Sequence, residues 1–281
     1  MLDQANNLRR KMKTPRVVSV VSGKGGVGKS NLSLNFALAL KKLGKKVILF
    51  DLDIGMANLD ILMGLLPSRT IVDMVEENLS IWEIIEHGTG GLSYIAGGSG
   101  LSEVFRLDER KTEHFLRELG CLQKEYDTVI FDMGAGVSDD LLKFVLASDE
   151  AIVVTTPEPT AMTDAYAAMK FICRAGVQLP VRIVVNRSRS EKEGRETAVR
   201  LQQVADRFLN QKIRAFSVLP DDNTVPNAVR AGIPFLLYAP RAPVTKAVLD
   251  AAQAWSGLPS SGGGFLRKLR NYFHPGKERI L

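Results

Sequence analysis

A glycine-rich segment at residues 23–30, Gly-Lys-Gly-Gly-Val-Gly-Lys-Ser, constrains this chain more than any other feature. It fits G-x-x-x-x-G-K-[ST], the P-loop, whose backbone N–H groups surround phosphates. An apolar, β-branched run precedes it at 17–21, and residues 31–43 place apolar side chains at helical spacing. The segment therefore joins a predicted strand to the start of a predicted helix, where the helix dipole favours an anion. A glycine-rich turn with a chance lysine is the alternative.

The P-loop pattern assigns a role to each of its functional side chains. Lys29 is expected to reach the β- and γ-phosphates of a nucleotide, and the Ser30 hydroxyl is expected to bind Mg²⁺. The glycines let the backbone turn and approach the phosphates without a Cβ atom in the way. The nucleotide-binding residues expected here are Gly23, Gly25, Gly26, Val27, Gly28, Lys29, Ser30 and Asn31.

The composition indicates a soluble globular protein with one substantial core. The chain has 281 residues, of which 45% are hydrophobic, and α/β domains of about 250 residues are common. Cys121 and Cys173 form no C-x-x-C motif, so we expect a reducing cytosol and neither a disulfide framework nor an iron–sulfur site. The polar, basic start does not resemble a signal peptide, and no apolar run approaches the about 18 residues that a membrane span needs.

The formal net charge of +6 is concentrated at the two ends of the chain. Residues 1–16 contain five basic side chains against one acidic, and residues 265–281 have the same balance. Residues 17–264 therefore carry −2, which is +6 less +4 for each end. This distribution argues against a broad nucleic-acid-binding face on the body. It indicates instead that the two basic ends bind a partner or a surface.

Apolar, β-branched segments alternate with segments of helical periodicity along the body of the chain. Near-continuous apolar runs, such as 129–131 and 151–154, are typical of buried parallel strands. The alternation predicts an α/β fold with a mostly parallel twisted sheet and helices on both faces. Strands are predicted at 17–21, 46–51, 92–96, 126–132, 150–156, 181–186 and 214–219, and helices include 108–125, 160–175 and 190–210.

Four parts follow from these patterns. Residues 1–16 are a basic N-terminal segment, and 17–257 are the predicted nucleotide-binding domain. Residues 258–264 contain Ser-Ser-Gly-Gly-Gly, which predicts a flexible linker. The linker tethers a last segment, 265–281, to the body.

Three aspartates follow predicted strands and are candidates for nucleotide chemistry. Asp51 and Asp53 lie at i and i+2, so they can point into one crevice if the chain turns there, which Gly55 indicates. Helix-capping aspartates in a loop are the alternative. Asp132 ends the apolar run Val-Ile-Phe, which is the Walker-B pattern, and is expected to hold the Mg²⁺ shell.

The P-loop in full, K-G-G-V-G-K-S, resembles the deviant P-loop of the MinD/ParA class of ATPases. In that class the early lysine, here Lys24, reaches across a dimer interface to the partner's nucleotide. A cation supplied in trans neutralises charge on the transferred phosphoryl group, which makes hydrolysis depend on dimerisation. The resemblance implies ATP/ADP and Mg²⁺ as cofactors and a homodimer with ATP. A solvated loop lysine is the alternative for Lys24.

Two further segments resemble the switches of this class. Residues 51–60 match D-x-D-x-G-x-x-N-L-D, which implies that Asp53 orients or activates the attacking water, Asp51 lies near Mg²⁺ and Asn58 lies at the dimer face. Residues 133–136, Met-Gly-Ala-Gly, resemble switch II, although relatives often have Ser/Thr-Pro or Thr-Gly at the first two positions. The glycines provide the mobility that a γ-phosphate sensor needs.

Two later segments resemble the adenine-binding end. Asn186 would read the base, because its amide offers the donor and the acceptor that adenine N6 and N7 match. Pro220 and Asp221 would cover the base with backbone groups. No N-K-x-D guanine signature occurs, which favours ATP over GTP. A strand-end turn residue is the alternative for Asn186, and Glu158 is a candidate for the dimer interface because its segment resembles the T-x-P-E loop.

The last segment contains a short basic amphipathic helix. Arg267, Lys268 and Arg270 lie on the side opposite its apolar face, an arrangement suited to an anionic bilayer interface. At about 2.5 turns the helix is too short to be stable alone in water, so we expect it to be disordered or docked when free. A terminal helix packed on the body is the alternative. The expected membrane-contacting residues are Phe265, Leu266, Leu269, Tyr272 and Phe273.

The N-terminal segment at 3–9, Asp-Gln-Ala-Asn-Asn-Leu-Arg, matches D-Q-A-x-x-L-R. This is the N-terminal element of the FlhG family of flagellar ATPases, also called YlxH or FleN, and the resemblance covers nearly the whole chain. In that family the element stimulates the GTPase of the SRP-type protein FlhF. A disordered basic leader is the alternative. The partner-binding residues it implies are Asp3, Gln4, Ala5, Leu8 and Arg9.

The chain is identified from these segments as a member of the FlhG family. The family implies a cytoplasmic ATPase that binds the inner face of the cell membrane reversibly and regulates flagellar placement and number. The implied partners are an FlhF-like GTPase, flagellar C-ring proteins and an anionic membrane surface, with no specific nucleic acid. A MinD division-site regulator, a ParA-like DNA-partition ATPase and a binding module with little catalysis are the rivals. The last is disfavoured by the complete set Lys24, Lys29, Ser30, Asp53 and Asp132.

Overall fold

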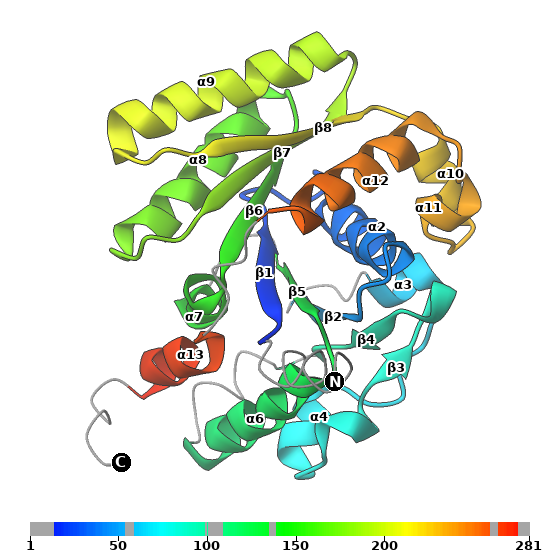
Figure 1. Cartoon of the computed structure of the whole chain (residues 1–281), viewed down its shortest axis with the longest axis vertical. Helices are drawn as coiled ribbons and strands as arrows, with labels where there is room; N and C mark the ends of the chain where they lie inside the picture. The colour runs from blue at the N-terminus through cyan, green and yellow to red at the C-terminus, as the bar shows by residue number, and fades with distance from the viewer. Residues whose placement is uncertain are drawn as a thin grey trace, which may run out of the picture.

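The computed structural model describes residues 14–53, 59–98, 100, 109–134, 139–258 and 264–274. Within these residues one eight-stranded sheet has the order β3-β4-β2-β5-β1-β6-β7-β8 (Figure 1). All neighbouring strands are parallel except the pair β3–β4. The strands are β1 (Arg16–Val21), β2 (Val47–Leu52), β3 (Glu86–His87), β4 (Ser93–Ile95), β5 (Thr128–Met133), β6 (Glu150–Thr155), β7 (Val181–Ser188) and β8 (Arg214–Pro220).

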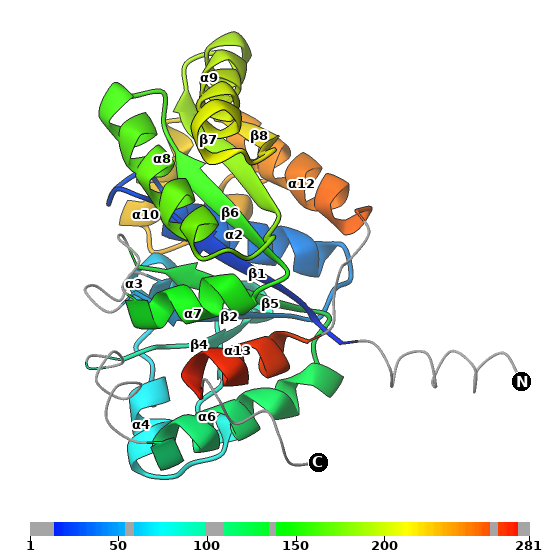
Figure 2. The same cartoon turned by 90° about the vertical axis from the view of Figure 1, so that its left-hand side faces the viewer.

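Helices cover both faces of this sheet (Figures 1 and 2). The arrangement confirms the predicted α/β fold with a mostly parallel sheet. The α-helices are α2 (Lys29–Lys42), α3 (Leu59–Met63), α4 (Ile71–Glu76), α6 (Glu109–Cys121), α7 (Asp139–Ala147), α8 (Pro159–Arg174), α9 (Glu191–Leu209), α10 (Thr224–Arg230), α11 (Phe235–Tyr238), α12 (Pro243–Ser256) and α13 (Phe265–Phe273). Three 3₁₀ helices span Ile81–Glu83, Thr89–Gly91 and Leu122–Lys124.

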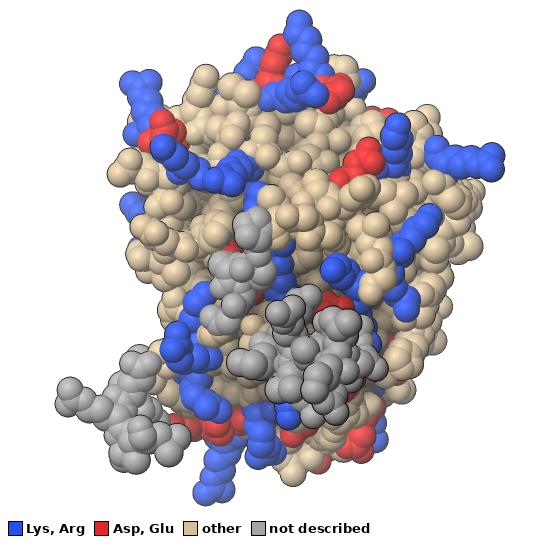
Figure 3. Space-filling view, in the orientation of Figure 1, with Lys and Arg blue, Asp and Glu red and all other residues tan. Residues whose placement is uncertain are grey.

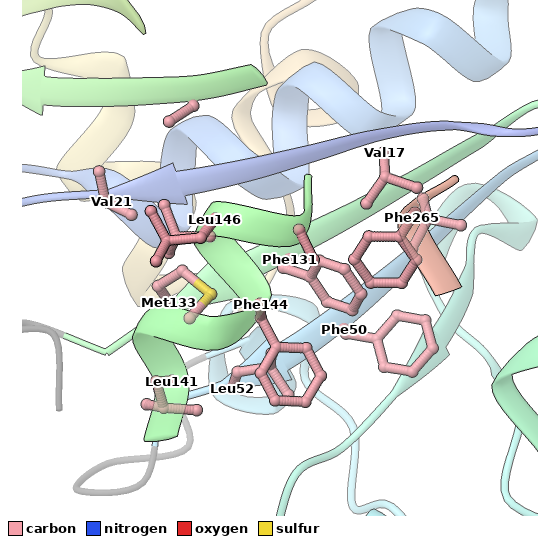
Figure 4. Close-up of a cluster of buried hydrophobic side chains, with 14 of the residues drawn as sticks. Val17, Val21, Phe50, Leu52, Phe131, Met133, Leu141, Phe144, Leu146 and Phe265 are labelled. Atoms are coloured by element: carbon pink, nitrogen blue, oxygen red, sulfur yellow. The ribbon is translucent and has the colours of Figure 1, made fainter. Parts of the chain in front are cut away.

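Alternation along the strands divides the core into two layers. Val17 and Val21 of β1 face a layer shared with α4, α6, α7, α8, α9 and α13, whereas Val18 and Val20 face α2, α3, α10, α11 and α12. Figure 4 shows part of the first layer, where Phe131 of β5 lies among aromatic side chains. The central strands β1, β2, β5 and β6 are buried at every position, so they are mostly apolar, which is the pattern that revealed them in the sequence.

Two features of the sheet were not predicted. The two-residue strand β3 was not predicted, because Glu86 and His87 are polar and pair only with the short strand β4. Arg16 was assigned to the N-terminal segment, but it opens β1 and is buried. The N-terminal segment therefore ends by residue 15. Among the described residues, no helix is both long enough and apolar enough to cross a bilayer.

Arg16 belongs to a buried ionic cluster around Glu150, the first residue of β6. The Glu150 carboxylate contacts the guanidinium of Arg16 at 2.5 Å and accepts hydrogen bonds from Arg182 Nε at 2.5 Å and Trp255 Nε1 at 2.6 Å. Arg16 also donates to the carbonyl of Trp255 at 3.0 Å, and its guanidinium lies over the indole ring. Glu150 therefore ties the beginnings of β1 and β7 to the end of α12.

Glu150→Gln is expected to lower the free energy of unfolding by about 3 kcal/mol, because it leaves two buried guanidinium groups without their carboxylate. Urea titration followed by circular dichroism measures this change. Glu125→Gln is the matched control, since Glu125 faces Lys46 at 3.7 Å on the surface and exposed pairs contribute about 0–1 kcal/mol. Equal effects of the two substitutions would show that the cluster does not stabilise the fold.

α13 lies against α6 and α7, and its apolar face is covered by the body (Figure 2). Phe265 is buried beside Phe131, with ring centroids 5.5 Å apart (Figure 4), and Leu269 is fully buried. Phe273 contacts Phe144 edge to face at a centroid distance of 5.8 Å. The docked position is one of the two expected for this helix outside a membrane.

Candidate functional site

The P-loop joins β1 to α2 and packs closely against α8. A Cβ atom at Gly23 would lie 1.9 Å from the carbonyl oxygen of Asp164, so only glycine fits there. Gly26 and Gly28 have φ of +80° and +90°, a left-handed backbone that other residues rarely adopt. Gly28 is the residue before α2, and it directs the first N–H groups of that helix towards the loop. The local sequence therefore builds an anion-binding backbone at the helix N-terminus.

The P-loop lysine and the Walker-B aspartate meet inside this loop. Lys29 Nζ lies 2.8 Å from Asp132 Oδ1 and donates to Ser30 Oγ at 3.1 Å, with only 6% of its side chain exposed. Ser33 Oγ donates to the same Asp132 oxygen at 2.6 Å. Ser33 was not predicted, although it lies one helical turn after Lys29 and faces β5, the strand that contains Asp132. These contacts bring together three predicted residues: Lys29, Ser30 and Asp132.

Asp51 is the neighbour of Asp132 in the register of β2 and β5. Its carboxylate accepts the N–H of Asp53 at 3.0 Å and that of Leu59 at 3.3 Å. Burial, and secondly the charge of Asp132, raise the pKa of Asp51 to about 7. Two buried carboxylates at adjacent strand ends therefore repel each other, and added positive charge would stabilise both.

A divalent cation fits these residues. Asp132 Oδ2 is buried and has no hydrogen-bond partner, so it is available as an oxygen ligand. In the described part of the chain no group of three His, Cys, Asp or Glu side chains is placed to hold a metal. Two carboxylates and the Ser30 hydroxyl suit Mg²⁺, which prefers oxygen ligands and usually keeps several waters. Ser30, Asp51 and Asp132 would therefore hold it.

Asp53 lies in the loop after β2, beside the segment that resembles switch II. A Cβ atom at Gly134 would lie 3.2 Å from Asp53 Oδ1, so the carboxylate faces this glycine closely. The two switch-like segments thus meet at the carboxyl end of the sheet, next to the P-loop. Gly55, Asn58 and the residues at 135–136 lie outside the described chain.

Lys24 is held within its own chain, at the start of α8. Its ammonium lies 3.6 Å from Glu158 Oε2 and donates to Thr160 Oγ1 at 3.2 Å, while 43% of the side chain remains exposed. The contact with Thr160 was not predicted, because it joins segments far apart in the sequence. A role of Lys24 in trans would require it to leave these partners.

The residues predicted for the adenine end line one cavity of about 830 Å³ beside the P-loop. Asn186 Nδ2 donates to the carbonyl of Val27 at 2.8 Å, which fixes its amide against the loop. The N–H of Asp221 donates to the carbonyl of Ser188 at 2.9 Å, so this amide is already used in the fold. The cavity walls include Gly28, Asn31, Asn186, Pro220, Asp221 and Glu158.

The residues predicted for the two tails are placed unequally. The partner-binding residues Asp3, Gln4, Ala5, Leu8 and Arg9 lie outside the described residues, as do 259–263 of the linker. In α13 the membrane-directed side chains face the body: Phe265 and Leu269 are buried, and Leu266, Tyr272 and Phe273 are half-buried.

Known proteins share this body. The ParA family model, described as NUBPL iron-transfer P-loop NTPase, matches residues 13–255. The antiactivator FleN of Pseudomonas aeruginosa is 35% identical over 254 residues, covering 89% of this chain and 90% of FleN. The flagellum site-determining protein YlxH of Helicobacter pylori is 39% identical over 192 residues, covering 68% of this chain and 64% of YlxH.

Solved structures share the fold. The septum site-determining protein MinD of Pyrococcus horikoshii, complexed with Mg-ADP, superposes with a TM-score of 0.70 at 27% identity, covering 86% of this chain and 96% of that chain. The predicted MinD/ParA-like P-loop NTPase fold is therefore confirmed.

Proposed function

The chain belongs to the ParA family of P-loop NTPases, with FleN and MinD among its relatives, and we propose that it is an ATPase that regulates flagellar placement and number. The observation that carries the nucleotide part is the convergence of Lys29, Ser30 and Asp132 at the N-terminus of α2. The flagellar part rests on similarity to FleN and YlxH.

Each residue of the site has a defined task in ATP hydrolysis. The backbone N–H groups of the P-loop and Lys29 bind the phosphates, and Lys29 exchanges its contact with Asp132 for the nucleotide. Ser30, Asp51 and Asp132 would hold Mg²⁺, which when bound would supply positive charge to the phosphate oxygens. Asp53 positions the attacking water, and Asn186 with the 220–221 loop holds the adenine. The products are ADP and phosphate.

Dimerisation with ATP completes the site. Lys24 leaves Glu158 and Thr160 and approaches the phosphates bound to the second protomer, where it neutralises developing charge. The contacts that hold Lys24 in one chain are partly exposed, so they cost little to exchange. Hydrolysis then separates the protomers. The protein therefore contacts the membrane and its partners only during the part of the ATP cycle in which it is a dimer.

Membrane binding uses α13 after it leaves α6 and α7. Its apolar side chains leave their contacts with the body and insert into the bilayer interface. Two copies in one dimer provide avidity that a single short helix lacks. The protein then acts from the cytoplasm at the inner face of the membrane. FlhF-like GTPase and C-ring proteins are the proposed partners there.

Deletion of 265–281 is expected to abolish ATP-dependent sedimentation with anionic liposomes and to leave ATP affinity unchanged. Arg267→Glu keeps the buried face of α13 intact and should weaken membrane binding more than about fivefold, because the loss of one basic residue near such a surface costs about 1 kcal/mol and the glutamate adds repulsion. Arg200→Glu on the exposed side of α9 is the matched control. Undiminished binding by the deleted protein, or equal binding to duplex DNA, would favour a ParA-like partition ATPase instead.

The N-terminal segment is expected to act on a GTPase partner. Gln4 and Leu8 lie at i and i+4, so in a short helix formed on the partner they would share one face; Leu8 would anchor the helix while Gln4 reaches the partner's nucleotide. A peptide of residues 1–20 should stimulate GTP turnover by FlhF, and Gln4→Ala or Leu8→Ala should remove the stimulation. Asn6→Ala, on the other face, is the control. Absence of stimulation at high peptide concentration would leave only the generic MinD-like function.

A further inference from the structure

The two carboxylate oxygens of Asp132 have different surroundings. Oδ1 faces two donors, the ammonium of Lys29 at 2.8 Å and the hydroxyl of Ser33 at 2.6 Å. Oδ2 is buried and has no hydrogen-bond partner. Buried polar atoms are normally paired, so an unpaired one indicates a place for a ligand. The carboxylate is therefore held through Oδ1, and Oδ2 is left for that ligand.

Asp51, the neighbouring carboxylate, is oriented by different groups. Its Oδ1 accepts the N–H of Asp53 at 3.0 Å, and its Oδ2 accepts the N–H of Leu59 at 3.3 Å. Backbone groups of the loop after β2 thus engage both of its oxygens. Of these two carboxylates, Asp132 is the one with an unengaged oxygen, and its orientation depends on side chains rather than on the backbone.

Ser33 reaches Asp132 from α2, one helical turn after Lys29. Ser33 is fully buried, and its Oγ also lies 3.1 Å from the carbonyl oxygen of Lys29. A hydroxyl has one proton, and an ionised carboxylate can only accept, so the shorter contact is the one in which Ser33 donates to Asp132. This bond fixes the carboxylate of β5 relative to the helix that follows the P-loop.

Lys29 cannot hold the same oxygen throughout the nucleotide cycle. In the proposed function its ammonium exchanges Asp132 for the phosphates. Among the described residues, Ser33 is then the donor that remains on Oδ1. Without Ser33 the carboxylate could turn about its Cβ–Cγ bond, because this torsion is broad for a planar end group, and Oδ2 would lose its defined direction.

From these contacts we propose that Ser33 is a positioning residue for the metal site: it holds Asp132 Oδ1 while nucleotide is bound, so that Oδ2 stays available to Mg²⁺. The proposal rests on the proposed nucleotide site. Ser33 acts through Asp132 and touches neither the metal nor the nucleotide. Loss of such an outer hydrogen bond to a metal-binding side chain typically weakens metal affinity about 10–100-fold.

The test is the Mg²⁺ dependence of ADP affinity in the full chain. Titration calorimetry gives the affinity first with EDTA and then at a series of Mg²⁺ concentrations, and the midpoint is the Mg²⁺ concentration that produces half of the gain. Wild type is compared with Ser33→Ala and with Ser33→Cys, which donates weakly but leaves no cavity. Thermal unfolding confirms that each variant is folded.

Ser148→Ala is the matched control. Ser148 is also fully buried, its Oγ also contacts the carbonyl oxygen four residues earlier, at 2.8 Å, and it makes a second hydrogen bond, with Ser19 at 2.8 Å. It lies just before β6 begins, away from the carboxyl end of the sheet. Its substitution therefore removes a similar buried hydroxyl without touching the site.

Both Ser33 variants are expected to bind ADP in EDTA within about twofold of wild type and to have a Mg²⁺ midpoint raised about tenfold. Ser148→Ala should keep the wild-type midpoint within about twofold. An unchanged midpoint in the Ser33 variants, an equal shift in Ser148→Ala, or an equal loss of ADP affinity in EDTA would overturn the proposal, because Ser33 would then only support the fold of α2. If wild type bound no ADP, or bound it without any response to Mg²⁺, the proposed nucleotide site would fail and the role of Ser33 with it.

Discussion

Lys29→Ala is expected to abolish nucleotide binding, whereas Lys24→Ala should bind nucleotide normally and fail to form the ATP dimer. Lys29 is buried inside the P-loop between Ser30 and Asp132, so its charge is available to phosphates with little competition from water. We expect its loss to weaken ATP binding by at least about 100-fold, or 2.7 kcal/mol. The side chain of Lys24 is partly exposed and lies against Glu158 and Thr160 at the start of α8.

Titration calorimetry with a non-hydrolysable ATP analogue separates these two effects, and size-exclusion chromatography with the same analogue reports dimerisation. Lys42→Ala, at the exposed end of α2, is the control for loss of a lysine from the same region. Thermal unfolding must accompany the titration, because removal of Lys29 leaves Asp51 and Asp132 without their buried cation. Indistinguishable behaviour of Lys24→Ala and Lys29→Ala would remove the role of Lys24 in trans.

The phosphate-binding part of the site could be predicted because its chemistry is local in sequence. The P-loop occupies a few consecutive residues between an apolar strand and a helix, and Asp132 directly follows an apolar run. Parallel strands end at the same edge of the sheet, so residues that follow them converge. The structure brings Lys29, Ser30 and Asp132 together for this reason.

Contacts between distant segments could not be predicted in the same way. Arg16 resembles the other basic residues of the N-terminal segment, and only the positions of Glu150 and Trp255 in the fold explain its burial. The contact of Lys24 with Thr160 likewise depends on how α8 meets the P-loop. In α13 the periodicity predicts an apolar face, but the same face suits a bilayer or a protein groove, so its docking site on α6 and α7 had to come from the structure.

The distribution of charge over the surface of the body also depends on the fold and cannot be predicted from the sequence. The basic excess at the two ends is evident in the sequence, whereas the body carries both signs of charge. Figure 3 shows Lys and Arg side chains spread over one face and interspersed with Asp and Glu. This mixture on the visible face agrees with a body that does not rely on a broad basic surface there.

Asp53→Ala is expected to retain ATP binding and lose hydrolysis. The phosphate-binding backbone, Lys29 and the magnesium-binding residues remain, so affinity should change by less than about threefold, as for surface substitutions. Without the carboxylate that faces Gly134, the attacking water loses its orienting group, and turnover should fall by about 10²–10⁴-fold. The dimer should then accumulate, because ATP persists in both protomers.

Phosphate release under saturating ATP measures the turnover, and size exclusion with ATP itself reports the trapped dimer. Asp206→Ala on the exposed side of α9 is the matched control and should hydrolyse ATP at the parent rate. The combination of results separates the causes: a water-positioning residue affects turnover and not affinity, whereas collapse of the loop after β2 would reduce both. Hydrolysis at the parent rate by Asp53→Ala would show that another group orients the water, and the assignment of this carboxylate would be wrong.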